Sequence, residues 1–296
     1  MELRVLRYFV EAAREGSMTR AAERLHVTQP TLSKQLGGLE HELGQKLFVR
    51  SSYSVRLTEA GTLLLRRAED ILDMAGKAEA ELKSLDSEVG GIVSIGCPES
   101  ESFKYFARAM KRARAAAPRV TFSVLSGDSA HVTERLDRGL LDLAAVMDRV
   151  NEAKYNFIPL SAFDTWVAVM RRDHPLAAKA RVTLNDLFAV PLICSRQCVE
   201  QDFPRWFGDR LGRLNVAATY NLFYNAAILV REGLGVAVSY DRLADTETGG
   251  ELCARPIEGL NRSQMFVIWK KHQLFSPAAQ LLLDELKAEF AAEAGA

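Results

Sequence analysis

The sequence is short of cysteine and has no long apolar run, and both absences exclude classes of protein. Its four cysteines, at positions 97, 194, 198 and 253, form no CxxC pair, which argues against a disulfide framework and a structural zinc site. No apolar run approaches the roughly 18 residues that span a bilayer, and the N-terminus has no charged-then-apolar signal pattern. We therefore expect a cytoplasmic protein with reduced thiols and no membrane partner.

Motifs of the common enzyme classes are missing as well. The sequence contains no GxSxG, GxxxxGKS/T, GxGxxG or HExxH motif, and its five histidines form no HxxxH or HxH pair. We therefore expect no catalytic residues, no metal site and no cofactor.

The formal net charge of +0 hides an asymmetry along the chain. Residues 1–58 hold nine Lys/Arg and six Glu, which gives 9 − 6 = +3, so the rest of the chain sums to −3. With 48% hydrophobic and 26% charged residues, the 296-residue chain fits a globular protein of about two domains. The basic excess is modest, but it lies at one end and bears on the choice of partner.

Three regions follow one another along the sequence. The pattern of residues 1–58 predicts short helices followed by a two-stranded hairpin. A long linker helix is predicted over 58–89. From Gly90-Gly91, which we interpret as a hinge, residues 90–296 alternate short apolar strands with helical segments. That alternation predicts an α/β domain with mostly parallel sheets and helices on both faces.

Apolar residues of the long helix repeat at spacings of three and four, the pattern of a coiled coil. Thr58 is its expected N-cap. The helix could pack this stripe on its own chain, but little apolar chain lies nearby to cover it. We favour pairing with a second copy, and the dimerisation stripe consists of Leu64, Ala68, Ile71, Ala75, Ala78, Leu82 and Leu85.

A helix-turn-helix is predicted at about 18–37, where small Ala21 and Ala22 let two helices approach. The stretch TQPTLSKQL opens its second helix with Thr28 as N-cap, and Pro30 is tolerated because first-turn amides have no intrahelical acceptor. These polar residues can simply cap and solvate the helix. Alternatively, the helix N-terminus meets a DNA phosphate while its side chains reach base edges.

The run from Thr19 to Gly61 resembles the winged helix-turn-helix of the LysR-type transcriptional regulators, through AAxxLxVxQPxLSxQxxxLExxLGxxLFxR followed by LTxAG. The wing tip at 51–54 departs from the pattern in lacking extra basic or Gly residues. The resemblance covers essentially the whole chain and implies a regulator of transcription that binds promoter DNA. It assigns to DNA binding Thr28, Gln29, Pro30, Thr31, Ser33, Lys34, Arg50 and Arg56.

The same resemblance implies a homodimer that assembles further into a homotetramer, with RNA polymerase as a candidate partner. It also implies that residues 90–296 form an effector-binding domain of the type 2 periplasmic-binding-protein-like fold, with a small-molecule co-inducer of unknown identity between two lobes. We place lobe I at about 91–162 and 267–296, and lobe II at about 163–266.

Ligands in such sheets bind beyond the C-terminal ends of strands, and this rule selects three loops. The candidate effector contacts are Pro98, Glu99, Ser100, Ser102, Ser195, Arg196, Tyr220, Asn221 and Asn225. Several have a structural alternative: Ser100, Ser102 and the two asparagines can cap helices, and Arg196 can form a surface salt bridge.

Two acidic residues of the first loop, Glu99 and Glu101, depart from the family pattern. We expect both to face solvent; if either faces the cleft, an amine-bearing effector is favoured over an anionic one. Cys97 and Cys194 close strands that point at the cleft, which would suit a thiol sensor. We favour small buried hydrophobes, because free cysteine usually packs as one.

Two other functions compete with a ligand-responsive regulator. An enzyme with an appended helix-turn-helix is not supported by any catalytic motif, and a solute-binding protein for transport would need a signal pattern that the N-terminus lacks. We therefore favour a sequence-specific DNA-binding regulator that is controlled by a small molecule.

Overall fold

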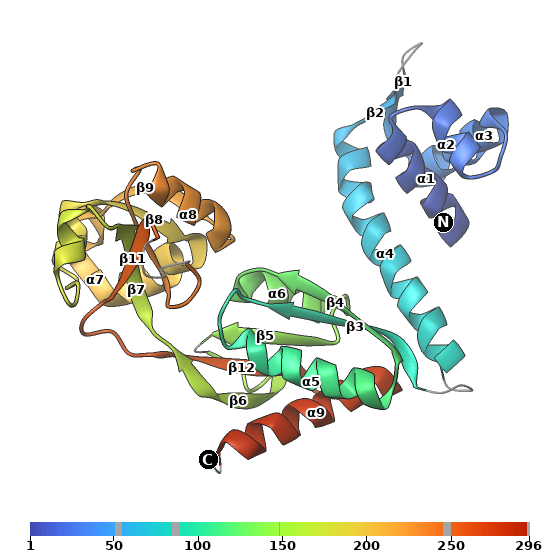
Figure 1. Ribbon diagram of the computed structural model, residues 1–296. Coiled ribbons are helices and arrows are strands. Elements are labelled where there is room, and N and C mark those ends of the chain that lie inside the picture. Colours follow the sequence, from blue (N-terminus) through green and yellow to red (C-terminus); the bar gives the residue numbers. More distant parts are fainter. Residues whose placement is uncertain (51–54, 85–88, 148, 245–249, 295–296) are drawn as a thin grey trace. The chain divides into compact units, whose positions relative to one another are not determined.

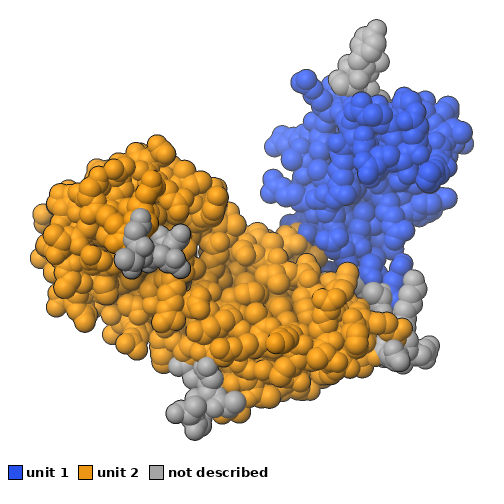
Figure 2. All heavy atoms as spheres, viewed as in Figure 1, with its two compact units in different colours: residues 1–83 blue, residues 84–296 orange. Residues whose placement is uncertain are grey.

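The structure, a computed structural model, describes residues 1–50, 55–84, 89–147, 149–244 and 250–294. The chain divides into two compact units, residues 1–83 and residues 84–296, coloured blue and orange in Figure 2. Each unit has its own hydrophobic core.

Unit 1 is a helical head with a small hairpin, followed by a long helix (Figure 1). Its core is built on Phe9, Leu32 and Leu36, which are fully buried, and on Ala21, which lets helices approach closely. The hairpin is antiparallel, as the alternating sequence predicts. The elements are α1 (Leu3–Glu15), α2 (Met18–Arg24), α3 (Gln29–Leu43), β1 (Phe48–Arg50), β2 (Val55–Leu57) and α4 (Glu59–Ser84).

The start of α4 is fixed by Thr58 and Gly61. Thr58 Oγ1 accepts a hydrogen bond from the Gly61 N–H at 2.9 Å, which confirms the predicted cap. A Cβ atom on Gly61 would lie 2.1 Å from the Leu47 carbonyl oxygen, so only glycine permits this approach. The helix is described to Ser84, and Gly90 and Gly91 begin the next strand; their interpretation as a hinge remains a prediction.

Unit 2 holds two five-stranded sheets, ordered β4-β3-β5-β12-β6 and β11-β7-β10-β8-β9. Both are mixed, which corrects the prediction of mostly parallel sheets: β12 and β7 run antiparallel to their neighbours. The first sheet is built from β3 (Gly90–Cys97), β4 (Arg119–Ser126), β5 (Leu143–Met147), β6 (Tyr155–Asp164) and β12 (Ser263–Lys270). The second is built from β7 (Trp166–Arg171), β8 (Pro191–Ser195), β9 (Asn215–Tyr220), β10 (Val236–Tyr240) and β11 (Leu252–Pro256).

Helices cover both faces of each sheet, so each sheet forms a lobe. In lobe I, α5 and α9 pack on one face and α6 on the other, and in lobe II, α8 lies opposite α7 and the short 3-10 turns. These helices are α5 (Phe103–Ala116), α6 (Ser129–Asp137), α7 (Phe203–Phe207), α8 (Phe223–Arg231) and α9 (Pro277–Ala294). The chain crosses between the lobes twice, where β6 leads into β7 and where β11 leads into β12 (Figure 1).

Candidate functional site

The first turn of α3 lies on the surface of unit 1. Gln29, Pro30 and Thr31 are exposed, and Lys34 is exposed one turn later. Leu32 points the other way and is fully buried in the core, which fixes the rotation of the helix. The helix therefore presents its N-terminus and polar side chains outward.

Two threonines form the cap of this helix. Thr28 Oγ1 accepts a hydrogen bond from the Thr31 N–H at 3.4 Å and lies 2.8 Å from Thr31 Oγ1. The predicted N-cap is confirmed, and both hydroxyls take part in it. Ser33 is half-buried, so Gln29 and Lys34 are the long, exposed side chains among the residues predicted to contact DNA on this helix.

The hairpin after α3 carries the two arginines predicted for the wing. Arg56 is exposed on β2, and the backbone of Arg50 pairs with Val55 across the hairpin. The side chain of Arg50 and the wing tip at 51–54 lie outside the described residues. The wing contacts therefore remain predictions.

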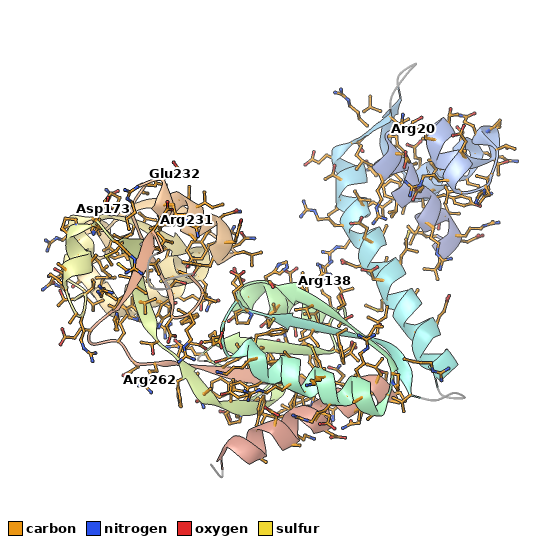
Figure 3. The ribbon with its side chains drawn as sticks, in the orientation of Figure 1. Arg20, Arg138, Asp173, Arg231, Glu232 and Arg262 are labelled. Atoms are coloured by element: carbon orange, nitrogen blue, oxygen red, sulfur yellow. The ribbon has the colours of Figure 1, made fainter. Side chains whose placement is uncertain are left out.

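Two arginines of the segment 1–58 form ion pairs with glutamates of the same segment. Arg20, labelled in Figure 3, contacts Glu15 at 3.2 Å, and Arg24 contacts Glu15 at 2.5 Å and Glu11 at 3.0 Å. The hydrogen bond from Arg24 lowers the pKa of Glu15. Lys34 forms no ion pair with any described residue, so it keeps its charge available for a phosphate.

Glu40 ties the far end of α3 to the wing, a role that the sequence did not suggest. The residue is buried, and Oε1 accepts hydrogen bonds from the N–H groups of Leu47 at 2.9 Å and Phe48 at 3.2 Å. Oε2 contacts Lys46 at 3.1 Å. Burial raises the pKa of Glu40, but these hydrogen bonds outweigh burial and hold the pKa below its ordinary value.

The predicted dimerisation stripe on α4 divides into two parts. At its N-terminal end Ala68 is fully buried and the partly buried Leu64 packs against the core of unit 1, which favours the alternative, packing on the same chain, for these two residues. Further along, Ile71 is 36% exposed and Leu82 is 67% exposed. Ala75 is half-buried, Ala78 is exposed, and Leu85 lies outside the described residues.

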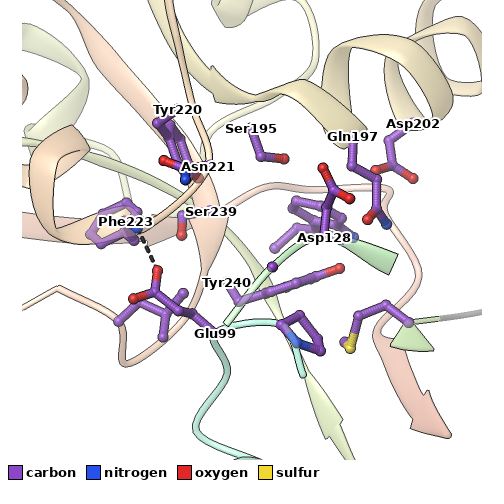
Figure 4. A pocket seen from close by; sticks show the side chains of 15 residues that line it. Glu99, Asp128, Ser195, Gln197, Asp202, Tyr220, Asn221, Phe223, Ser239 and Tyr240 are labelled. Carbon is purple, nitrogen blue, oxygen red and sulfur yellow. Dashed lines mark hydrogen bonds between the residues drawn. The ribbon is translucent and has the colours of Figure 1, made fainter. Parts of the chain in front are cut away.

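A cavity of about 60 Å³ lies between the lobes of unit 2 (Figure 4). Its lining comes from the ends of strands and from the loops that follow them, as the topology predicts. Five predicted effector contacts line it: Pro98, Glu99, Ser195, Tyr220 and Asn221. The other four, Ser100, Ser102, Arg196 and Asn225, do not, and the last two are exposed elsewhere on the surface.

The serines of the first loop bind a buried aspartate instead of facing the cavity. Ser100 Oγ donates to the carboxylate of Asp164 at 2.8 Å, and Ser102 Oγ donates to it at 3.0 Å. Burial raises the pKa of Asp164, while these two hydrogen bonds act in the opposite direction. Asp164 ends β6 at the crossover, so the serines anchor the loop that carries Glu99 to the point where the lobes join.

Each lobe supplies an acceptor to the first turn of a helix in the other lobe. The Phe223 N–H of α8 donates to the Glu99 carboxylate, drawn as a dashed line in Figure 4. The Ser129 N–H of α6 donates to Gln197 Oε1 at 2.9 Å. The expectation that Glu99 faces solvent is therefore wrong. Glu101 is exposed as expected, and its Oε1 lies 3.7 Å from Lys104 Nζ.

All four cysteines are buried and unbonded. Burial raises the pKa of Cys97 and of Cys194 to about 12, and the charge of Glu99 contributes to the shift at Cys97. Such thiols hold almost no thiolate at neutral pH, which favours the interpretation as packed hydrophobes over a redox sensor.

Several lining residues were not predicted from the sequence. Asp128, which accepts a hydrogen bond from the His131 N–H at 2.8 Å, follows the strand ending at Ser126, and that position beyond a strand end could have identified it. Trp166 begins β7 just after the crossover, and Tyr240 ends β10. Their ring centroids lie 4.3 Å apart. No local pattern indicates that these two rings meet.

A winged helix-turn-helix followed by a two-lobed domain with an interlobe cavity defines a class of protein, the DNA-binding regulators with a ligand-binding domain. Residues 3–62 match the family described as "Bacterial regulatory helix-turn-helix protein, lysR family", and residues 86–291 match the "LysR substrate binding domain". The chain belongs to the LysR family of transcriptional regulators. It is therefore a DNA-binding regulator of transcription with a small-molecule effector domain, and not an enzyme.

Individual relatives agree with this assignment. The Hca operon transcriptional activator HcaR of Escherichia coli K12 is 30% identical over 280 residues, covering 93% of each chain. The uncharacterized regulator YnfL of the same organism is 31% identical over 296 residues, covering 95% of this chain and 96% of its own. The fold is similar to full-length CbnR complexed with its target DNA, with TM-score 0.75, 21% identity, and coverage of 98% of this chain and 100% of CbnR.

Among the described residues, no helix is both long and apolar enough to cross a membrane. In the same part of the chain, His, Cys, Asp and Glu side chains form no group of three that could hold a metal ion.

Proposed function

We propose that the exposed first turn of α3 reads bases in the major groove of promoter DNA, with Gln29 as the principal reader and Lys34 on a phosphate. The observation that supports this is the rotation of the helix: Leu32 is fully buried while Gln29 and Lys34 are exposed. Glutamine can form a bidentate hydrogen-bond pair with adenine, whereas lysine provides charge.

The proposal extends to the assembly. The exposed apolar part of α4 would pair with a second copy and hold two heads about 34–36 Å apart, one turn of DNA, so that a two-fold site is read. A dimer of dimers, contact with RNA polymerase and a cytoplasmic location, where the DNA is, belong to the same proposal. The wing arginines Arg50 and Arg56 would hold the backbone.

Gln29→Ala tests the base-reading role. The site is first identified by footprinting the full-length protein on DNA beside its own gene. Gln29→Ala should then weaken specific binding by about 1–3 kcal/mol while leaving non-specific binding almost unchanged.

Lys34→Ala provides the contrast, because loss of a phosphate contact should weaken both kinds of binding equally and lower the salt slope by about 1. Gln45→Ala, an exposed glutamine outside α3, is the matched control and should change neither. Equal loss of specific and non-specific binding in Gln29→Ala would show that this helix does not read bases.

We propose further that a small molecule in the interlobe cavity controls DNA binding, by shifting the angle between the lobes. A metabolite screen by thermal shift tests this, since a ligand that binds the folded state raises the melting temperature. A hit should also alter the footprint. A broad screen without any hit would remove the support for this role.

A further inference from the structure

We propose that the effector of the interlobe cavity is a small organic cation, an amine or a guanidine with a short apolar body. The inference rests on the proposed role of the cavity as the effector site. It begins with the charge of the lining, which contains the carboxylates of Glu99, Asp128 and Asp202. No Lys, Arg or His is among the described residues that line the cavity.

Two of these carboxylates have no ion-pair partner among the described residues. Asp202 forms an ion pair with Arg205. Glu99 and Asp128 form no ion pair within the described ranges, and their hydrogen-bond donors are the backbone N–H groups of Phe223 and His131. Helix N-termini supply only partial positive charge. The cavity therefore retains negative charge that a cationic ligand would neutralise.

The positions that would attract an anion are already occupied by oxygen atoms of the protein. The Glu99 carboxylate accepts a hydrogen bond from a backbone N–H group in the first turn of α8. Asp128 and Gln197 both accept hydrogen bonds from backbone N–H groups in the first turn of α6. An anionic effector would have to displace these acceptors and then lie beside like charges. Both steps disfavour it, because a like charge nearby and an unpaired buried acceptor cost free energy.

The aromatic residues and the size of the cavity limit the shape of the cation. The rings of Trp166 and Tyr240 lie against each other on the lining, and aromatic faces attract ammonium and guanidinium groups. A volume of about 60 Å³ holds only a few non-hydrogen atoms. A compact head group with a short apolar tail fits better than a large ligand, for which pockets of about 300–1,000 Å³ are usual.

The test measures binding to the full-length protein by calorimetry, with compounds paired by skeleton and differing in charge. The pairs are ethylamine with acetate, n-propylamine with propionate, n-butylamine with butyrate, and methylguanidine with propionate. We expect saturable binding of amines or of the guanidine and none of the carboxylates.

Glu99→Gln and Asp128→Asn should each weaken cation binding at least tenfold. Both variants keep an oxygen acceptor for the helix N–H group and remove only the charge, so the lobes should keep their contact; the melting temperature of each variant without ligand checks this. Glu101→Gln, on the same loop but exposed and beside Lys104, is the matched control and should bind like the original protein.

Binding of a carboxylate in preference to its amine partner would overturn the cation assignment, and so would failure of all the cations. A carboxylate that binds and alters the footprint would leave the proposed effector role standing. A cation that binds in a Glu99-dependent manner without changing the footprint would support the cation site and remove its regulatory role.

Discussion

Glu40 is a buried side chain that we expect to stabilise the DNA-binding head. Replacing it with alanine leaves the N–H groups of Leu47 and Phe48 without their acceptor, and we expect a loss of about 2–3 kcal/mol in the free energy of unfolding. Glu40→Gln keeps an acceptor and should lose less. Urea unfolding of unit 1, followed by circular dichroism and by hydrogen exchange at residues 44–50, measures both changes.

The lowered pKa of Glu40 also predicts a dependence on pH. Because the folded-state pKa lies below the unfolded one, the stabilisation is present above the unfolded pKa and is lost as pH falls through the folded pKa. Glu40→Gln should reduce this acid sensitivity. Glu42→Ala, whose carboxylate is exposed and contacts the N-terminal amine, is the control; acid sensitivity equal to the original in Glu40→Gln would contradict the prediction.

Single residues also mark the limit of what the sequence predicts. The cap at Thr28 and the outward position of Gln29 could be predicted, because capping and helical periodicity act over a few residues. The partners of Ser100 could not, since Asp164 lies 64 residues away and only the crossover brings it there. The chosen loops beyond strand ends therefore reach the cavity, whereas several of the individual side chains within them do not line it.

At the scale of elements, helix positions followed from local patterns while strand directions did not. The helix-turn-helix expected at about 18–37 coincides with α2 and the start of α3, and the linker helix expected after the Thr58 cap begins at Glu59. Alternating strands and helices predicted parallel pairing, but β12 returns from the other lobe and runs antiparallel to β5 and β6. The direction of a returning strand depends on the path of the whole chain.

The exposed stripe of α4 predicts what should happen when its apolar character is removed. Glu at both Ile71 and Leu82 would bury charge if the helix pairs as proposed, so we expect the proposed dimer to dissociate. Sedimentation should then report the mass of one chain. The control is Thr62→Glu with Arg66→Glu, which by helical spacing lie on the opposite face of α4 and should not change the measured mass. If the variant with Glu at Ile71 and Leu82 also keeps its mass, pairing through this stripe is excluded.

The two lobes of unit 2 are joined by a reciprocal pair of hydrogen bonds, and this predicts how they move. Gln197→Ala removes the acceptor of the Ser129 N–H. One such bond contributes about 0.5–1.5 kcal/mol, roughly a two- to thirteenfold change in an equilibrium between closed and open lobes. If the lobes open as rigid bodies, the distant Phe223 N–H should lose protection as well. Hydrogen exchange of peptides covering 127–132 and 221–226 measures both sites, with Glu200→Ala, an exposed neighbour of Gln197, as the control. Faster exchange at Ser129 alone would mean that the two contacts open independently. Ligand binding would then move individual loops of the cavity and would not close the whole domain.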